Sequence, residues 1–242
     1  MSLKNSKIRL YFNASIAKDD DIVFNKDQTH YLSKVMRLRT GDTLEIFNGI
    51  NGAWKAKITD ISKKSANAKI ICQTQIQRNP PDLWVLFAPI KKNRTQFIIE
   101  KATELGAARI IPVKTEFTNA ERIKRENLCA HAIEAAEQCR GTFVPAVEEL
   151  TELGNLLNKW PDDRGILFCN EMLAGKKIEL PKKGIRKWAI LIGPEGGFSV
   201  SEQTKLNNNK LIFPIDLGPR ILRADTAVVA AMSLWQKRFG DW

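Results

Sequence analysis

The 242-residue sequence has few of the side chains that bind soft metals or form disulfides. Its four cysteines lie far apart without a CxxC pair, and only two histidines could join them as ligands. This spacing argues against a zinc site and favours small buried thiols in a reducing compartment. We therefore predict no bound metal. The residues concerned are Cys72, Cys129, Cys139, Cys169, His30 and His131.

Long apolar runs are also missing. No stretch approaches the roughly 20 residues that a membrane span needs. The opening MSLKNSKIRLYF lacks an apolar stretch of about 7 to 15 residues leading to a cleavage site. With 43% hydrophobic and 27% charged residues, the composition is that of a globular protein. We expect a location in the cytoplasm.

Three familiar catalytic and nucleotide-binding motifs are absent from the sequence. Without GxGxxG and a later acid, a Rossmann dinucleotide site is unsupported, and without GxxxxGK[ST] so is a P-loop ATPase. No GxSxG nucleophile elbow is present either. A nucleotide-like ligand would therefore need a different kind of loop.

Acidic residues are scarce in the first third of the chain. The whole sequence carries 38 Lys and Arg against 27 Asp and Glu, a net charge of +11. Residues 1–80 alone hold 14 basic and 7 acidic residues. This excess predicts an anionic partner without identifying it, and either nucleic acid or a merely solvated basic surface would account for it.

Short strands separated by turns are expected in residues 1–75. TLEIF and AWKAKIT flank an Asn- and Gly-rich turn, which predicts a hairpin, and AKIIC predicts a further strand. HYLSKVMRLRTGD, residues 30–42, has apolar residues at helical spacing and predicts one short basic helix. We interpret residues 1–75 as a small β barrel and 76–82, which contains Pro80 and Pro81, as a linker.

Apolar strands alternate with amphipathic helices in residues 83–242. Helices are expected at 94–105, 121–140, 148–159 and 226–239, with Gly106 and Gly141 ending the first two. This alternation predicts an α/β domain with a parallel sheet covered on both faces. Ligands of such sheets gather beyond the carboxyl ends of the strands, which directs attention to residues 91–94, 169–173, 193–198 and 217–223.

Two glycine-bearing turns stand out among these segments. In AILIGPEGGFSVSE a buried strand enters a sharp turn, and Ser199 and Glu202 are spaced as a capping box. Glycines there let backbone groups approach a flat ligand, although a tight strand-to-helix turn alone would need them equally.

The second turn lies in LGPRILRADTAVVAA. Arg220 and Arg223 stand three residues apart, and Asp225 and Thr226 are placed to cap the final helix. The two arginines suit phosphate or carboxylate oxygens, but they could be ordinary surface charges.

Together these motifs resemble the ribosomal small-subunit RNA methyltransferase family E. The resemblance rests on GPEGGFS, LGPRILR and the TAVVAA helix, preceded by EKATELGAARIIPV and IEAAEQCRGTFVP, and it extends from HYLSKVMRLRTGD to RFGDW. It implies a SPOUT-type α/β domain with a trefoil knot and a parallel sheet, plus an amino-terminal PUA-like β barrel. It also implies S-adenosylmethionine as cofactor and methylation of N3 of a uridine in the decoding region of 16S rRNA.

The resemblance places the cofactor against three segments and near the last helix. At two positions the chain departs from the family's common ILRTETA, with Ala224 and Asp225 in ILRADTA. The implied cofactor-binding residues are Cys169, Asn170, Glu171, Ile192, Gly193, Pro194, Glu195, Gly196, Gly197, Leu217, Gly218, Ile221, Leu222, Arg223 and Thr226.

Arginine is the catalytic residue type that we expect. Loss of the imide proton from uridine N3 leaves a negative charge, which Arg223, or as second choice Arg220, would stabilise. The alternative is an arginine that only holds phosphate or the cofactor's carboxylate. Glu195 is a weaker candidate for a general base.

The same basic surface would hold 16S rRNA within the small subunit, with the target base unpaired or flipped outward. A homodimer is also implied, with Val228, Ala231, Met232, Trp235 and Phe239 of the last helix at the interface or in ordinary core. Two rival functions are a ribose 2′-O-methyltransferase of the same class and a non-catalytic RNA-binding assembly factor. The candidate RNA-binding residues are Arg9, His30, Lys34, Arg37, Arg39, Lys91, Lys92 and Arg94.

Overall fold

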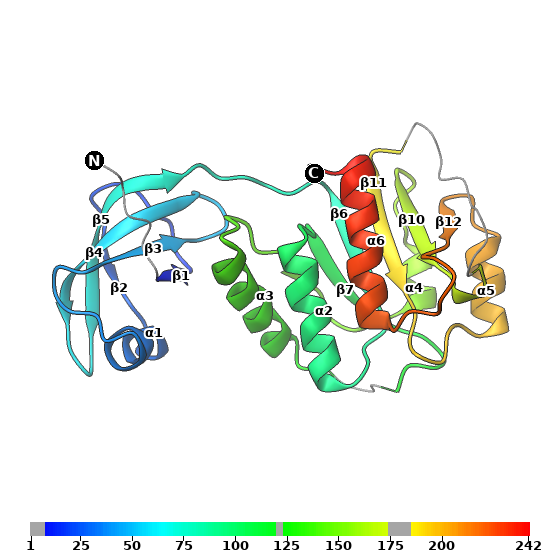
Figure 1. The fold of residues 1–242 in the computed structure, drawn as a ribbon, viewed down its shortest axis with the longest axis horizontal. Coiled ribbons are helices and arrows are strands. Elements are labelled where there is room, and N and C mark those ends of the chain that lie inside the picture. The colour runs from blue at the N-terminus through cyan, green and yellow to red at the C-terminus, as the bar shows by residue number, and fades with distance from the viewer. Residues whose placement is uncertain (1–7, 120–122, 174–184) are drawn as a thin grey trace. The chain divides into compact units, whose positions relative to one another are not determined.

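The computed structural model describes residues 8–119, 123–173 and 185–242 (Figure 1). The chain divides into two compact units. Unit 1 contains residues up to Asn79 and the segment Ala136–Val144, and unit 2 contains Pro80–Ala135 and Pro145–Trp242. The sequence pattern placed 136–144 in the second domain, because composition does not reveal packing between segments distant in the chain.

Unit 1 is built on a five-stranded sheet with the order β1-β3-β4-β5-β2. β1 runs parallel to β3, and the remaining pairs are antiparallel. The predicted hairpin is β3–β4, and its turn contains Gly49 and Gly52, both at positive φ. The strands are β1 (Arg9–Tyr11), β2 (Asp21–Val23), β3 (Thr43–Phe47), β4 (Ala53–Ile61) and β5 (Ala66–Gln75).

The basic helix of unit 1 begins earlier than its periodicity indicates. α1 (Lys26–His30) starts at a capping box between Asn25 and Gln28 and continues as a π-helical turn over Tyr31–Val35. The helix cannot continue through the basic run because Arg37 adopts a φ of 54°. The basic side chains therefore lie partly on a helical turn and partly on the loop that follows it.

Unit 2 contains the parallel sheet that the sequence predicts. Its strand order is β12-β10-β11-β6-β7-β8, with β9 also paired to β7, and every pair is parallel. The strands are β6 (Leu83–Phe87), β7 (Arg109–Lys114), β8 (Ala146–Val147), β9 (Thr151–Glu152), β10 (Arg164–Cys169), β11 (Lys187–Ile192) and β12 (Ile212–Ile215).

Helices cover both faces of this sheet, so its central strands are apolar on both sides. α6 packs on β11 and against α2, and both helices lie on one face in Figure 1. On the other face, Leu153 of α4 and Leu206 of α5 share a core with strand residues such as Phe168. The helices are α2 (Lys92–Glu104), α3 (Arg125–Cys139, from Ala136 in unit 1), α4 (Leu153–Asn158), α5 (Val200–Asn207) and α6 (Ala224–Phe239).

Helix ends confirm some of the predicted signals and correct others. Gly106 follows α2 at a φ of 80°, and Ser199 and Glu202 form the predicted capping box of α5. After α3 the left-handed residue is Arg140, with a φ of 61°, so the prediction that Gly141 ends this helix is wrong. The expected helix 148–159 is shortened to α4 because Thr151 and Glu152 pair with β7. Of the expected helix 121–140, residues 121 and 122 lie outside the described residues.

The final helix begins at Ala224, with Arg223 as its N-cap and no side-chain cap. The prediction that Asp225 and Thr226 cap it is therefore wrong: both lie inside its first turn, where the Asp225 carboxylate accepts the Thr226 N–H at 2.9 Å. Val228, Ala231, Met232 and Trp235 are buried within the chain itself, as ordinary core. Among the described residues, no helix is long and apolar enough to cross a membrane.

Candidate active site

The candidate site rests on the carboxyl ends of three neighbouring parallel strands. In the middle strand, β10, Cys169 pairs in register with Ile192 of β11 and with Ile215 of β12. These three residues therefore end their strands at one level. The chain then leaves each strand into a loop, and the three loops meet above this floor, as the carboxyl-end rule predicts.

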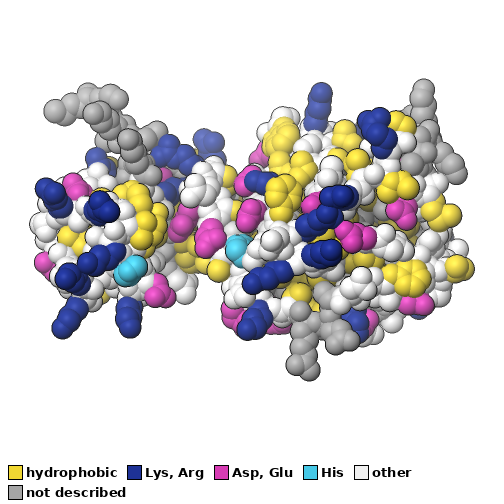
Figure 2. All heavy atoms as spheres, turned by 60° about the horizontal axis from the view of Figure 1, so that its bottom comes forward, with side chains coloured by type: hydrophobic (Ala, Val, Ile, Leu, Met, Phe, Trp, Pro, Cys, Tyr) yellow, Lys and Arg dark blue, Asp and Glu magenta, His cyan; other side chains and the backbone are white. Residues whose placement is uncertain are grey.

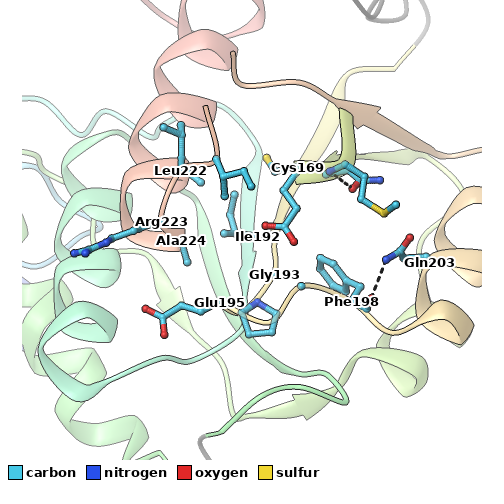
Figure 3. Close-up of a pocket in the computed structure, with 16 residues that line it drawn as sticks. Cys169, Ile192, Gly193, Glu195, Phe198, Gln203, Leu222, Arg223 and Ala224 are labelled. Atoms are coloured by element: carbon cyan, nitrogen blue, oxygen red, sulfur yellow. Dashed lines mark hydrogen bonds between the residues drawn. The ribbon is translucent and has the colours of Figure 1, made fainter. Parts of the chain in front are cut away.

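The larger cavity above the floor has a volume of about 200 Å³ (Figure 3). Its walls come from the loop after β10, the loop after β11 and the segment that leads into α6. The two glycine-bearing turns therefore face one cavity region. The lining residues are Cys169, Asn170, Glu171, Met172, Ile192, Gly193, Pro194, Glu195, Gly197, Phe198, Gln203, Ile221, Leu222, Arg223, Ala224 and Ala227.

A smaller cavity of about 50 Å³ shares walls with the first. Leu217, Gly218 and Arg220 line it, together with Ile215 and Asp216. Ile221 and Leu222 line both cavities. The remaining shared residues are Cys169, Asn170, Glu171 and Ala227.

The structure brings most of the predicted cofactor residues to these two cavities and leaves two outside. Gly196 lines neither; a Cβ there would lie 3.2 Å from Cβ of Phe117. Thr226 also lines neither and is exposed on α6. One residue further along the helix, Ala227 lines both cavities. Successive side chains of an α-helix point about 100° apart around the axis, so Thr226 and Ala227 face different directions.

Two glycines in the loop after β11 are required by close packing. A Cβ on Gly193 would lie 2.5 Å from the ring of Phe198. Gly197 adopts a φ of 70°, and a Cβ there would lie 3.0 Å from Oε1 of Glu171. Gly193 therefore admits an aromatic ring of the protein itself, a reason for glycine that the sequence motif did not reveal.

Several lining residues are absent from the predicted set of cofactor-binding residues, although Met172 and Phe198 lie in the predicted ligand segments 169–173 and 193–198. Phe198 packs edge-on against Phe168 with ring centroids 5.0 Å apart, and Gln203 donates to the Phe198 carbonyl at 2.8 Å. Phe198 lies in the segment 193–198 and in the motif GPEGGFS, but it was not assigned to the cofactor. The α5 residue Gln203 carried no comparable signal. The others are Met172, Ala224 and Ala227 in the larger cavity and Ile215 and Asp216 in the smaller one.

The two arginines proposed for catalysis are both exposed. Arg223 lines the larger cavity, but its side chain extends away from the labelled residues on the opposite wall (Figure 3). Arg220 lines the smaller cavity. Among the described residues, the Arg223 guanidinium has no hydrogen-bond or ion-pair partner. The Arg223 guanidinium is thus placed to meet an external anion.

Glu195 and Arg94 pair with each other. Arg94 Nη1 lies 2.7 Å from Glu195 Oε1, and Arg94 Nε lies 3.8 Å from Asp225 Oδ2. The Glu195 carboxylate points away from the cavity centre (Figure 3). This arrangement does not support Glu195 as a general base, and it occupies an arginine that the sequence analysis assigned to RNA.

Burial favours the neutral form of the Cys169 thiol. Burial raises the pKa of this thiol well above its usual range. A neutral thiol is a poor nucleophile and contributes no charge to the floor of the site. Among the described residues, no cluster of three or more His, Cys, Asp or Glu side chains could hold a metal ion.

In unit 1 the candidate RNA-binding residues fall into two groups. Arg9 is 7% exposed, and its guanidinium contacts Glu45, two backbone carbonyls and the Phe47 ring. The structure thus places it in the interior, where RNA cannot reach it. The exposed group consists of His30, Lys34, Arg37 and Arg39. Figure 2 shows several Lys and Arg side chains close together on the surface of unit 1.

Family models match both parts of the chain. Residues 77–236 match an RNA methyltransferase domain, and residues 24–71 match an RNA methyltransferase PUA domain. Together with the parallel sheet and its loop-lined cavities, these matches define the class: a SPOUT-type RNA methyltransferase with a PUA-like domain.

Relatives narrow the class to one family. The chain is 31% identical to ribosomal RNA small subunit methyltransferase E of Rickettsia conorii, over 93% of each sequence. It is 30% identical to the protein of that name from Bacillus subtilis, over 86% of each. The chain therefore belongs to the ribosomal RNA small subunit methyltransferase E family.

Solved structures agree with this assignment. A ribosomal RNA small subunit methyltransferase E from Neisseria gonorrhoeae, bound to S-adenosyl methionine, is 25% identical with a TM-score of 0.88. The alignment covers 97% of this chain and 99% of that one. A putative methyltransferase from Legionella pneumophila with bound SAM is 27% identical with a TM-score of 0.84, over 97% and 99%.

Proposed function

We propose that this chain transfers the methyl group of S-adenosylmethionine to N3 of a uridine in the decoding region of 16S rRNA. The observation that carries the proposal is the convergence of the two glycine-bearing loops on adjacent cavities at one level of the sheet. Membership of the family supports it, as do the cofactor-bound crystal structures of the two relatives.

The residues present fit this cofactor. Apolar side chains such as Ile192, Ile221 and Leu222 line the larger cavity beside the glycine turn, and such a lining suits the flat apolar faces of a purine. Gly197, at a φ of 70°, lets that turn pass close to Glu171. The lining residues of 169–171, 192–195, 197, 217–218 and 220–223 would hold the molecule. When bound, the cofactor supplies an electrophilic methyl group on a sulfonium.

Arg223 is the group we assign to the reacting base. Methylation at N3 requires loss of the imide proton, and a cation beside the ring stabilises the resulting negative charge. Arg223 extends outward from the cavity wall, which suits contact with RNA better than contact with a buried carboxylate. Arg220, on the smaller cavity, is the second candidate. The raised pKa of the Cys169 thiol disfavours its thiolate form and argues against this thiol as the proton acceptor.

Exposed basic residues would hold the RNA. The pairing edge of uridine carries N3, so the base must leave its stack before it meets the site. His30, Lys34, Arg37 and Arg39 of unit 1 form one exposed basic group, and Lys91 and Lys92 at the start of α2 form another. The cytoplasm follows as the location, because ribosomal subunits are found there.

A homodimer belongs to the same proposal, on a surface different from the one first considered. The buried stripe of α6 is already used within the chain. Leu234 of α6 is 57% exposed and Phe97 of the neighbouring helix α2 is 38% exposed. Light scattering of wild type and of Leu234→Asp would test this surface; a monomeric wild type would refute the dimer.

The deciding experiment follows methyl transfer from labelled cofactor. We expect label in assembled small subunits or naked 16S rRNA, and mass spectrometry should place it on uridine N3. A 2′-O-methyl product would identify the ribose-modifying rival, and binding without transfer would identify an assembly factor. Arg223→Ala should slow transfer at least tenfold, which corresponds to about 1.4 kcal/mol. Arg238→Ala, at the far end of α6, is the matched control.

A further inference from the structure

Arg94 pairs with Glu195, which lines the larger cavity, and with Asp225, which follows the lining residue Ala224. Arg94 itself does not line the cavity. It belongs to the first turn of α2, and its guanidinium lies 2.7 Å from Glu195 and 3.8 Å from Asp225. Glu195 belongs to the loop after β11. Asp225 follows Ala224, which lines the cavity from the first turn of α6. Three elements distant in sequence thus meet at one side chain.

The shape of the guanidinium explains why a single residue can hold both walls. Nη1 faces one carboxylate while Nε faces the other, whereas a lysine ammonium is a point charge without this fork. The Arg94 side chain is 27% exposed, that of Asp225 19% and that of Glu195 51%, so water screens the contact with Asp225 less than the contact with Glu195.

Two contacts hold the Asp225 carboxylate in its orientation. Its Oδ1 accepts the backbone N–H of Thr226 at 2.9 Å, and its Oδ2 faces Arg94. The amino-terminal turn of α6 also carries a partial positive charge that favours a carboxylate there. A displacement of Arg94 would therefore act directly on the first turn of α6, next to Arg223 and Ala224.

We infer that Arg94 is a positioning residue that sets the separation between the Glu195 loop and the first turn of α6. The consequence for cofactor binding rests on the proposed function. If the larger cavity holds the cofactor, its width depends on a side chain that does not line it. Arg94 acts through Glu195 and Asp225, and its charge is directed toward them rather than toward RNA.

The first test uses the ligand-free protein. Hydrogen–deuterium exchange should be faster in Arg94→Met than in wild type over both 193–199 and 221–227. Lys101→Met is the matched control, because it removes an ion pair of 2.7 Å from the same helix, with Glu104. It should leave both segments unchanged. Unchanged exchange in Arg94→Met would overturn the positioning role, whether or not the protein binds S-adenosylmethionine.

The second test measures affinity for S-adenosylmethionine by calorimetry. A half-exposed ion pair predicts a Kd raised roughly three- to tenfold in Arg94→Met. Arg94→Lys should lie between it and wild type. Glu195→Gln should have a larger effect than Asp225→Asn, because its contact is shorter. In the charge-swapped pair, Arg94→Glu with Glu195→Arg, affinity should recover relative to Arg94→Glu alone.

Three further outcomes separate this inference from its rivals. An unchanged Kd with a weaker salt dependence of RNA binding would make Arg94 an RNA ligand and overturn the inference. A raised Kd together with a large fall in Tm would reduce Arg94 to a stabilising residue, and would also overturn it. If wild type binds no S-adenosylmethionine, the proposed function fails, while the exchange experiment still decides the positioning role.

Discussion

Arg9 in unit 1 and Arg94 in unit 2 use the same side chain for different purposes. Arg9 is 4% exposed in its side chain and pairs with Glu45, which is 7% exposed. Arg94 pairs with Glu195 at 27% and 51% exposure. The sequence predicts an RNA contact for both arginines, and in the structure each forms an ion pair with a glutamate.

Burial decides what each pair does. Burial lowers the pKa of Arg9, and the nearby Glu45 charge opposes that shift. An isolated charge is costly to bury, so removing either partner of the Arg9 pair leaves a severe penalty. The Arg94 pair is partly hydrated and contributes little to folding. We infer that its role is to position the Glu195 loop and the first turn of α6.

The largest expected effect is on folding, from Arg9→Met. Glu45 would remain buried without its cation, and the carbonyls of Ala136 and Gly141 would each lose a donor. We expect the free energy of unfolding to fall by about 3 to 5 kcal/mol. Urea denaturation measures it. Arg94→Met should lose less than about 1 kcal/mol, and equal losses in the two variants would break the comparison.

Glu45→Gln should have the next largest effect. The amide keeps a bond with Thr74, whose hydroxyl donates to Glu45 Oε2 at 2.7 Å, but it removes the charge opposite Arg9. A loss of about 1 to 3 kcal/mol is expected. Glu195→Gln serves as the exposed counterpart. If it destabilises the fold as much as Glu45→Gln, burial is not the deciding variable.

Arg37→Ala should change RNA binding and leave folding alone, the reverse of the Arg9 profile. If Arg37 meets a phosphate, the slope of log K against log salt should fall in magnitude by about 0.7 to 0.9. Filter binding at several salt concentrations measures the slope. An unchanged slope would remove Arg37 from the RNA surface. Because φ at this position is 54°, Arg37→Gly is a useful control for backbone strain.

The smallest effect belongs to a fully exposed pair. Lys187 donates to Asp163 at 2.6 Å and lowers the pKa of that carboxyl. A depressed pKa gives stability that is present above the unfolded value and is lost as the pH falls through the folded value. Asp163→Asn should therefore barely shift the Tm at pH 7. Thermal unfolding at a series of pH values should show a smaller loss of stability with acid in this variant than in wild type, and only at low salt.

Much of the fold followed from local patterns in the sequence. The apolar strands of unit 2 needed both faces covered, which fixed a parallel sheet, and the carboxyl-end rule then located the cavities. The capping box at Ser199 and the turn at Gly106 were equally local signals. Such features depend on residues within one turn of one another.

The wrong predictions concern residues whose contacts come from segments distant in the sequence. Arg9 looked like a surface cation because nothing near it in sequence reveals the carbonyls of Ala136 and Gly141. The cap of α6 failed for a related reason, since Asp225 bonds inside its own turn and also faces Arg94. Gly193 accommodates Phe198, a contact that the motif contains but does not explain.

The shared register of β10, β11 and β12 makes the site tolerant of one kind of change and intolerant of another. Exchanging Cys169 for a side chain of similar size changes one residue of the cavity floor and leaves the register of the three strands unchanged. Inserting or deleting a single residue within β10 would reverse the facing of every later side chain in that strand and break its alignment with Ile192 and Ile215. The length of β10 therefore determines the geometry of the candidate site as much as the identity of its residues does.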